Sequence, residues 1–422
     1  MSLEEIYNLF LQFPSVATDT RTLKQNDIYF ALKGPNFNGN NFIEAAFKNG
    51  ASFCITDEIP KFANDKIIKV DDVLETLQQL SLYHRRKLNI PFLAITGTNG
   101  KTTTKELIHQ VLSKKFKTYT TEGNLNNHIG IPLTILKIKA DAQIAVIEMG
   151  ANHIGEIKSY CKIVEPTHGL ITNCGSAHLE GFGSVEGVKK GKGELYDFLA
   201  ENNGIAFINK GLIYLIGMSE KIRNKIFYGK GTEFSGIAIE NEIELKIQLK
   251  NSGIIKTNLV GDYNLDNVLA AYTIGEYFKI DEEEIISALE SYKPSNNRSQ
   301  LLEWNSNKII LDAYNANPSS MQAAIKNFGK LDSAEKALVL GGMKELGNDS
   351  IQEHENLINL INNFKWNFVV LVGDEFKNLM PEAKHFNNSD EAGTWLSQHQ
   401  PKNLSILIKG SRSNKMEKVL DN

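Results

Sequence analysis

The sequence predicts an α/β protein with three domains: a small α/β N-terminal domain, a central parallel-sheet domain with a phosphate-binding loop, and a C-terminal doubly wound domain. The chain has 422 residues, about three times the length of a common domain. Apolar runs alternate with helical patterns along most of it, which favours parallel sheets covered by helices. Turn-rich segments near residues 89 and 295 predict domains at 1–88, 89–294 and 295–422.

The first domain is predicted to mix helices with short strands. Asn89-Ile90-Pro91 ends it, because this tripeptide interrupts both helix and strand patterns. The expected helices are Leu3–Phe13, Phe42–Asn49 and Val73–Leu88, and the expected strands are Asp27–Leu32 and Ser52–Thr56.

In the second domain, strands and helices alternate as in a parallel sheet. The expected strands are Pro91–Thr96, Gln143–Met149, His168–Asn173 and Gly204–Asn209. From about residue 227 to 259 the pattern changes, and Glu242–Leu249 alternates with period two, so antiparallel strands are expected there. Helices at Asn264–Phe278 and Glu282–Ser291 follow.

The third domain follows the polar segment Lys293–Ser299, which is predicted to be a linker. Its expected strands are Lys308–Asp312, Ala337–Leu340, Phe368–Val372 and Ser405–Ile408. This fourfold alternation of strand and helix predicts a second doubly wound sheet.

Composition and charge narrow the class of protein. The 46 basic and 50 acidic residues are spread along the chain with a net charge of -4, so nucleic acid is not an expected partner. The start of the chain is acidic where a signal peptide would be basic, and no apolar stretch approaches membrane-spanning length. Three widely separated cysteines suit a reducing compartment. We therefore expect a soluble cytoplasmic protein without a membrane partner.

The segment after the apolar run Phe92–Thr96 indicates phosphate binding. It reads Gly97-Thr98-Asn99-Gly100-Lys101-Thr102-Thr103 and leads into a helical pattern. Glycines let backbone N–H groups approach phosphates, and the helix N-terminus adds positive potential. Lys101 would reach the β- and γ-phosphates, and the Thr102 hydroxyl would bind Mg²⁺. The loop is a shortened form, because Ile95 stands where the common pattern has its first glycine. An ordinary strand-to-helix turn is the alternative.

Polar residues at predicted strand ends are further candidates, since ligands of open α/β sheets bind there. Glu148 follows an apolar strand and is the expected second Mg²⁺ contact; otherwise it is a surface residue. For His178, the sequence supports two interpretations equally, a metal ligand and a structural histidine. Lys189, Lys190 and Lys192 indicate a solvated basic face on spacing alone.

A carboxylate, an aromatic ring and two amides follow the first strand of the third domain. The segment Asp312-Ala313-Tyr314-Asn315-Ala316-Asn317-Pro318 fits nucleotide binding, and it fits an Asn/Pro turn equally well. Asp262 and Asn264 open a predicted helix, where they could simply be caps.

These motifs resemble those of the Mur ligases, the cytoplasmic amide ligases of peptidoglycan synthesis. The resemblance covers all three domains in order. Within the family it is strongest to the members that join D-alanyl-D-alanine to UDP-N-acetylmuramoyl-tripeptide. The similar segments are residues 18–21, 27–34, 96–103, 123–132, 148–157, 177–184, 312–318 and 409–412.

The resemblance implies roles for individual residues. Lys101, His178 and Lys192 would be catalytic, and Lys192 would be carbamylated, which turns a cationic amine into an anionic oxygen ligand. Two Mg²⁺ ions would be held by Thr102, Glu148, His178 and Lys192. ATP would contact Gly97, Thr98, Asn99, Gly100, Lys101, Thr102, Thr103, Asn267, Arg298, Asp312 and Tyr314. The substrates would contact Thr20, Arg21, Asn124, Asn126, Asn127, Asn315 and Asn317, with the first domain holding the UDP end. The departures from the family pattern are Gly342, where Asp is expected, and His128, where an acidic residue is more usual.

The activity implied is ATP-dependent amide formation through an acyl phosphate, with ADP and phosphate as products, in cell wall biogenesis, cell shape and cell division. A monomer is expected. The third residue of the tripeptide, lysine or diaminopimelate, stays open. The alternatives are another Mur-type ligase, a folylpolyglutamate synthase-like ligase, and a non-catalytic nucleotide-binding switch. A guanine-specific switch is disfavoured, because Asn209-Lys210-Gly211-Leu212 lacks the aspartate of the guanine-reading motif.

Overall fold

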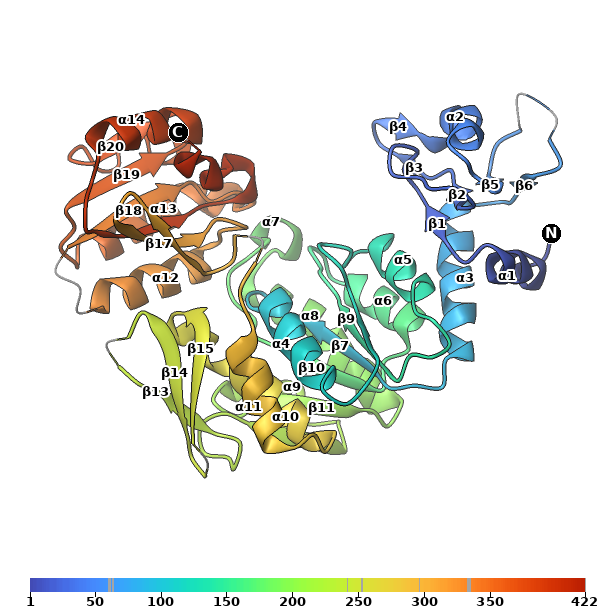
Figure 1. Ribbon diagram of the computed structural model, residues 1–422, viewed down its shortest axis with the longest axis horizontal. Helices are drawn as coiled ribbons and strands as arrows, with labels where there is room; N and C mark the ends of the chain where they lie inside the picture. Colours follow the sequence, from blue (N-terminus) through green and yellow to red (C-terminus); the bar gives the residue numbers. More distant parts are fainter. Residues whose placement is uncertain are drawn as a thin grey trace.

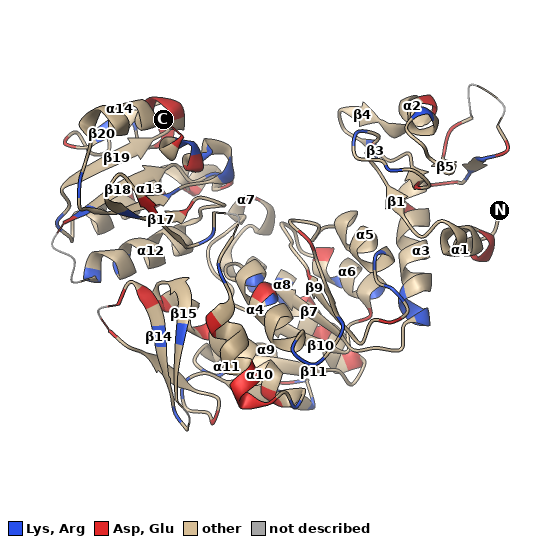
Figure 2. Ribbon diagram, in the orientation of Figure 1, with Lys and Arg blue, Asp and Glu red and all other residues tan. Residues whose placement is uncertain are grey.

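The computed structural model describes residues 1–59, 62, 64–240, 242–251, 253–295, 297–331 and 335–421. Figure 1 shows the N-terminal and C-terminal parts of the chain at opposite ends of the view, each seated on the central part. Lys and Arg are interspersed with Asp and Glu in all three parts (Figure 2). Among the described residues, no helix combines the length and the apolar character that a membrane span needs.

The N-terminal part is a small four-stranded sheet with helices. Its strands run in the order β1-β2-β5-β6 and all pairs are parallel. They are β1 (Val16–Ala17), β2 (Ile28–Phe30), β5 (Phe53–Thr56) and β6 (Ile67–Lys69). A separate hairpin pairs β3 (Lys33–Gly34) with β4 (Phe37–Asn38). The helices are α1 (Leu3–Gln12), η1 (Gly39–Phe42), α2 (Ile43–Lys48) and α3 (Val73–Lys87).

Helix α3 joins the N-terminal part to the central part. It starts where the Asp72 side chain accepts a hydrogen bond from the Glu75 N–H. Near its end, the Arg85 guanidinium donates to the carbonyl oxygens of Val164 and Glu165 at 2.7 and 2.9 Å, and it lies 3.7 Å from the Phe92 ring centroid. These contacts hold the end of α3, and with it the N-terminal part, against the central part.

The central sheet has six parallel strands in the order β12-β11-β10-β7-β9-β8. They are β7 (Phe92–Thr96), β8 (Thr118–Thr120), β9 (Ile144–Glu148), β10 (His168–Ile171), β11 (Ile205–Asn209) and β12 (Asn224–Tyr228). The four strands predicted here are present. Every residue of β7 and β9 is buried, as expected for apolar strands in the middle of a parallel sheet.

Helices cover both faces of this sheet. Two apolar clusters, one on each face, include residues of α4, α10 and α11 in one case and of α6 and α8 in the other. The helices of this part are α4 (Lys101–Leu112), α5 (Gly130–Leu136), α6 (Glu156–Val164), α7 (Leu179–Phe182), α8 (Val185–Glu201), α9 (Ile213–Met218), η2 (Asp262–Asn264), α10 (Leu265–Tyr277) and α11 (Glu282–Ser291).

A three-stranded antiparallel sheet, ordered β13-β14-β15, flanks the central sheet. Its strands are β13 (Gly236–Ala238), β14 (Glu244–Leu249) and β15 (Ile254–Val260). The expectation of antiparallel strands from the period-two pattern is confirmed: Leu245, Ile247 and Leu249 are buried while the residues between them are more exposed.

The C-terminal sheet also has six strands, in the order β16-β17-β21-β18-β19-β20, and only the β16–β17 pair is antiparallel. The strands are β16 (Gln300–Trp304), β17 (Asn307–Asp312), β18 (Lys336–Gly341), β19 (Phe368–Val372), β20 (Lys384–Phe386) and β21 (Ser405–Lys409). Its helices are α12 (Pro318–Lys330), η3 (Gly347–Asp349), α13 (Ser350–Ile361), η4 (Asp374–Phe376), α14 (Ser389–His399), η5 (Arg412–Asn414) and η6 (Met416–Leu420). The predicted α/β class with parallel sheets is therefore observed.

We keep 1–88, 89–294 and 295–422 as proposed domain limits, because each of the sheets lies within one of these ranges. Within the proposed linker Lys293–Ser299, Asn296 lies outside the described residues.

Candidate active site between the central and C-terminal domains

The phosphate loop connects β7 to α4, and two of its glycines meet steric demands. Gly97 has φ +149°, and a Cβ added there would lie 1.9 Å from the Thr172 hydroxyl oxygen. Gly100 has φ +79°, and its added Cβ would lie 2.5 Å from the Asn267 Oδ1. Both glycines are needed for a loop that passes this close to β10 and α10.

Lys101, the first residue of α4, folds back over the loop. Its Nζ donates to the carbonyl oxygens of Gly97 and Thr98 at 2.8 and 3.1 Å. Burial lowers the pKa of this amine, while the carboxylate of Glu148 acts in the opposite direction. The cation therefore sits at the helix N-terminus with weak carbonyl partners that an anionic ligand could replace.

Glu148 supplies a buried carboxylate beside this loop. It ends β9 and is only 2% exposed. Its Oε1 accepts a hydrogen bond from Asn126 Nδ2 at 2.8 Å, whereas Oε2 is buried without a hydrogen-bond partner among the described residues. The Thr102 hydroxyl lines the same cavity. An unsatisfied carboxylate oxygen and a hydroxyl fit a hard divalent cation.

His178 lines the same cavity and bridges two domains. Its Nδ1 is 2.5 Å from the Glu345 Oε2 of the C-terminal domain. Both residues have left-handed backbone conformations, with φ +52° and +62°. Burial lowers the pKa of the imidazole, and the Glu345 carboxylate opposes that shift. The contact leaves Nε2 as the imidazole nitrogen available to a ligand.

Lys192 corrects the sequence-based interpretation of a solvated basic face. Lys190 is exposed and Lys189 pairs with Glu186, but Lys192 is 2% exposed. The Lys192 side chain faces the interior because α8 packs along the central sheet. The Nζ lies 5.4 Å from the Phe182 ring centroid and forms no hydrogen bond or ion pair with any described residue. Burial, aided by the charge of Lys101, lowers the pKa of the amine to about 7.

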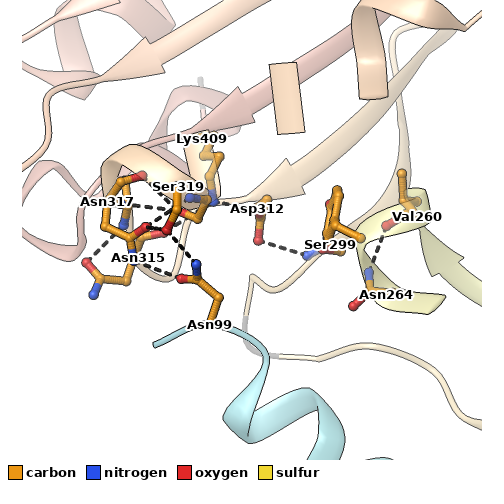
Figure 3. Close-up of polar contacts among 12 residues, drawn as sticks. Asn99, Val260, Asn264, Ser299, Asp312, Asn315, Asn317, Ser319 and Lys409 are labelled. Carbon is orange, nitrogen blue, oxygen red and sulfur yellow. Dashed lines mark hydrogen bonds and ion pairs between the residues drawn. The ribbon is translucent and has the colours of Figure 1, made fainter. Parts of the chain in front are cut away.

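The C-terminal domain contributes the facing wall. The Arg298 guanidinium lies 3.5 Å from the Tyr314 ring centroid. Asp312, at the end of β17, accepts from Lys409 Nζ at 2.5 Å and from the Ser299 N–H at 3.2 Å (Figure 3). In the sequence, Lys409 stands out only as part of the segment 409–412 that resembles the family. Its place at the end of a buried strand, beside a strand that ends in Asp312, was the signal that could have identified it.

Asn267 is already engaged in hydrogen bonds. Its Oδ1 accepts from the Thr104 hydroxyl at 3.0 Å, and its Nδ2 donates to Asn264 Oδ1 at 2.9 Å. Asn264 in turn donates to the carbonyl of Val260 (Figure 3). This chain of amides holds α10 against α4 at the edge of the cavity.

Most of these groups, Lys192 and Glu345 excepted, line one cavity of about 600 Å³ between the central and C-terminal domains. It brings together most of the residues expected from the sequence, namely Thr98, Asn99, Gly100, Lys101, Thr102, Thr103, Asn124, Asn126, Asn127, Glu148, His178, Asn267, Arg298, Asp312, Tyr314, Asn315 and Asn317. Lining residues that were not expected include Asn173, Tyr263, Ser319 and Lys409.

Four expected residues do not line this cavity: Gly97, Lys192, Thr20 and Arg21. Gly97 is covered by Thr172. Thr20 and Arg21 follow β1 in the N-terminal domain, which Figure 1 places on the other side of the central domain from the C-terminal domain. The Arg21 guanidinium pairs with Asp19 at 2.6 Å and lowers the pKa of that carboxyl to about 2.

Of the two departures from the family pattern, only Gly342 has a local explanation. A Cβ at Gly342 would lie 2.5 Å from the Glu375 Oε2, so an aspartate there would need Glu375 to move. His128 lines the cavity. Its backbone carbonyl accepts a hydrogen bond from Gln78 Nε2 of α3 at 3.0 Å, which connects the segment 123–132 to the N-terminal domain.

No group of three or more His, Cys, Asp or Glu side chains arranged to hold a metal occurs within the described part of the chain. A cation at Glu148 and Thr102 would therefore draw its remaining ligands from phosphate oxygens or water, as Mg²⁺ commonly does.

Comparisons with known proteins identify the family. The Mur ligase middle domain matches residues 95–275, and the Mur ligase, glutamate ligase domain matches residues 297–412. A relative from Bacillus subtilis, UDP-N-acetylmuramoyl-tripeptide--D-alanyl-D-alanine ligase, is 34% identical over 96% of this chain and 92% of its own length. Crystal structure I of MurF from Acinetobacter baumannii has a TM-score of 0.86 at 30% identity, covering 96% of this chain and 92% of that one. The MurF ligase from Thermotoga maritima in complex with ADP has the same TM-score at 28% identity, covering 97% of each chain. This chain belongs to the Mur ligase family.

Proposed function

We propose that this protein is an ATP-dependent ligase that joins D-alanyl-D-alanine to UDP-N-acetylmuramoyl-tripeptide in peptidoglycan synthesis. Its relatives carry this activity in their names and match nearly the whole chain. The observation that carries the proposal is the shared cavity, in which a phosphate loop, Lys101 and the unpaired carboxylate oxygen of Glu148 face a wall from the C-terminal domain.

The reaction needs activation because a free carboxylate has no good leaving group. A carboxylate oxygen of the tripeptide attacks the γ-phosphorus of ATP, the bond to the β-phosphate oxygen breaks, and ADP leaves. The amine of the dipeptide then attacks the acyl carbon of the acyl phosphate and loses a proton. Phosphate leaves with the bridging oxygen and the amide forms. The protein's main contribution is to position these groups and to balance their charge.

Lys101 is the group best placed to balance phosphate charge. Its amine would exchange the Gly97 and Thr98 carbonyl oxygens for phosphate oxygens. The loop residues from Gly97 to Thr103 would surround the phosphates with N–H groups at the start of α4. Asn267, Arg298, Asp312 and Tyr314 would hold the rest of the nucleotide from the cavity walls.

The proposed site would hold two Mg²⁺ ions. Thr102 and Glu148 would hold one, and His178 with a carbamylated Lys192 would hold the other. When bound, the ions supply positive charge that stabilises the transferring phosphoryl group. Carbamylation needs a neutral amine, and a pKa of about 7 provides one near neutral pH. The absence of a partner for the Lys192 amine within the described residues is consistent with this role.

The substrates would approach from two sides. Asn124, Asn126 and Asn127 line the cavity near Glu148, and Asn315 and Asn317 line it from the C-terminal domain. Thr20 and Arg21 would hold the UDP end from the N-terminal domain. All of these residues come from one chain, which supports a monomer. The proposed use of ATP and a UDP-linked precursor supports a cytoplasmic location.

The direct test is product release with UDP-N-acetylmuramoyl-tripeptide in the presence and absence of D-alanyl-D-alanine. We expect ADP and phosphate in equal amounts with the amide product, and only when both substrates are present. AMP and pyrophosphate would contradict the acyl phosphate route. Turnover with a folate and glutamate in place of these substrates would support the folylpolyglutamate synthase-like alternative.

A further inference from the structure

The side chain of Asn99 in the phosphate loop is held by the C-terminal domain. Its Nδ2 donates to the Ser319 hydroxyl oxygen at 2.8 Å, and its Oδ1 accepts from Asn317 Nδ2 at 2.8 Å. The Ser319 hydroxyl donates to Asn317 Oδ1 at 2.9 Å. The three side chains thus close a ring of hydrogen bonds in which each side chain donates once and accepts once, as Figure 3 shows.

The backbone of Asn99 is held from the other side, by the central sheet. Its N–H donates to Asn173 Oδ1 at 3.0 Å, and its carbonyl accepts from the Thr172 hydroxyl at 2.6 Å and from Asn173 Nδ2 at 3.1 Å. One residue therefore connects the end of β10 with the first turn of α12. It does so two positions before Lys101, in the loop that would surround the phosphates.

The ring is a contact between domains and not a local turn, because Asn99 and Asn317 are 218 residues apart. Elsewhere the same two domains meet through apolar packing as well as through polar contacts. Val260 at the end of β15 lies in one buried cluster with Ala316 and Met321, while His178 contacts Glu345 and the Tyr263 hydroxyl contacts the Ser299 hydroxyl. Apolar packing tolerates small rotations better than a directional ring does. The ring is thus more sensitive to how the domains are oriented than the apolar part of the interface is.

We propose that Asn99, Asn317 and Ser319 form a latch that couples nucleotide binding in the phosphate loop to the docking of the C-terminal domain. Asn99 is a positioning residue in this scheme. While the latch is closed, it holds the loop open for phosphate and keeps Arg298, Asp312 and Tyr314 facing it. Binding energy at either site then stabilises the other, because coupling between two sites is reciprocal. The inference rests on the proposed function, since the ligand that reports on the latch is the nucleotide.

The variants that test the latch must leave α12 intact. Asn317 caps this helix by accepting from the Ser320 N–H at 2.9 Å, and aspartate caps as well as asparagine does. Asn317→Asp therefore keeps the cap but puts a carboxylate oxygen opposite Asn99 Oδ1. Ser319→Ala and Asn99→Ala remove the other two members. Thr394→Ala is the matched control, because it removes a hydroxyl from the exposed side of α14 in the same domain.

The experiment measures ADP binding by calorimetry and the distance between dyes on the central and C-terminal domains by energy transfer, with the full chain. We expect Ser319→Ala and Asn99→Ala, each of which removes two of the three hydrogen bonds of the ring, to weaken ADP binding about fivefold or more. The double variant should be no weaker than the poorer single variant. Asn317→Asp should increase the distance between the dyes without ADP, and Thr394→Ala should change neither quantity.

Additive effects of Ser319→Ala and Asn99→Ala on ADP binding, or an unchanged distance in Asn317→Asp, would overturn the latch. These results differ from a failure of the proposed function, in which the unmodified protein itself would not bind ADP. Thermal unfolding of each variant separates loss of the latch from loss of the fold.

Discussion

At the phosphate loop, two glycines, Lys101 and Asn99 each have defined partners within the fold, and the facing wall is already present. In the N-terminal domain, the candidate substrate residue Arg21 is exposed and paired with Asp19, at a distance from the cavity. The nucleotide half of the candidate site is thus organised by contacts between the central and C-terminal domains, whereas the UDP half depends on where the N-terminal domain sits. Ligand binding has to complete the second half, as in enzymes whose domains close around their substrates.

The largest effect is expected from Lys101→Ala in the organised half. Loss of the only amine that covers the loop within the described residues should lower kcat/KM by about 10³-fold or more, because phosphate charge is then poorly balanced. Steady-state kinetics of ADP release measures it. Lys114→Ala, an exposed lysine beyond the end of α4, serves as control. Near-normal turnover with normal thermal unfolding would show that the loop does not serve catalysis.

Lys192→Ala should lower turnover by about 10²-fold, in line with the loss of a metal ligand. A small carboxylic acid in solution should restore part of the activity, since it returns an oxygen ligand that a damaged fold could not use. The exposed neighbour Lys190→Ala should behave like the unmodified protein. If Lys192→Ala retained full activity, the carbamate proposal would be wrong.

Arg21→Ala should affect only the incomplete half of the site. We expect KM for the UDP-linked substrate to rise about tenfold, the size of one charge-assisted hydrogen bond, with ADP affinity within about twofold of normal. Substrate titration and calorimetry give the two values. Arg86→Ala, which removes an exposed arginine paired with Glu165, is the control. An equal loss of ADP affinity would contradict the separation of the two halves.

The smallest effect concerns stability and pH. Because the pKa of Lys192 is about 7 in the folded chain and near 10.5 in the unfolded chain, the unfolded chain binds more protons between these values. Stability therefore rises with pH across the window from 7 to 10.5, by up to about 1.4 kcal/mol per pH unit for this one group. The difference in unfolding free energy between the unmodified protein and Lys192→Met should show this slope in buffer free of CO₂ and bicarbonate, where the amine is not carbamylated. If this difference in unfolding free energy did not change with pH, the Lys192 amine would be exposed to solvent and not buried.

The parts of the fold that sequence predicted best are the buried ones. β7 and β9 are continuous apolar runs in the centre of the central sheet. β17, β18, β19 and β21 are likewise mostly apolar and buried in the C-terminal sheet. The unpredicted strands are short or lie at sheet edges. β8 is a half-buried Thr-Tyr-Thr, and β12 and β16 have mixed exposure. None of these three strands therefore carries a strong hydrophobic pattern.

For the site, the sequence predicted the loop because its residues are adjacent in the chain. It could not predict contacts that depend on domain packing. The burial of Lys192 depends on how α8 packs, and Glu345 meets His178 only because two domains touch. The Asn99 ring joins residues more than 200 positions apart, and no local pattern marks that distance.

The central claim is that the tripeptide carboxylate is activated as an acyl phosphate. The most direct measurement uses UDP-N-acetylmuramoyl-tripeptide in which both oxygens of that carboxylate are ¹⁸O, and mass spectrometry of the products. The account predicts one ¹⁸O in each phosphate released, because a carboxylate oxygen bridges to phosphorus and leaves with it. Unlabelled phosphate, or label in AMP, would contradict it.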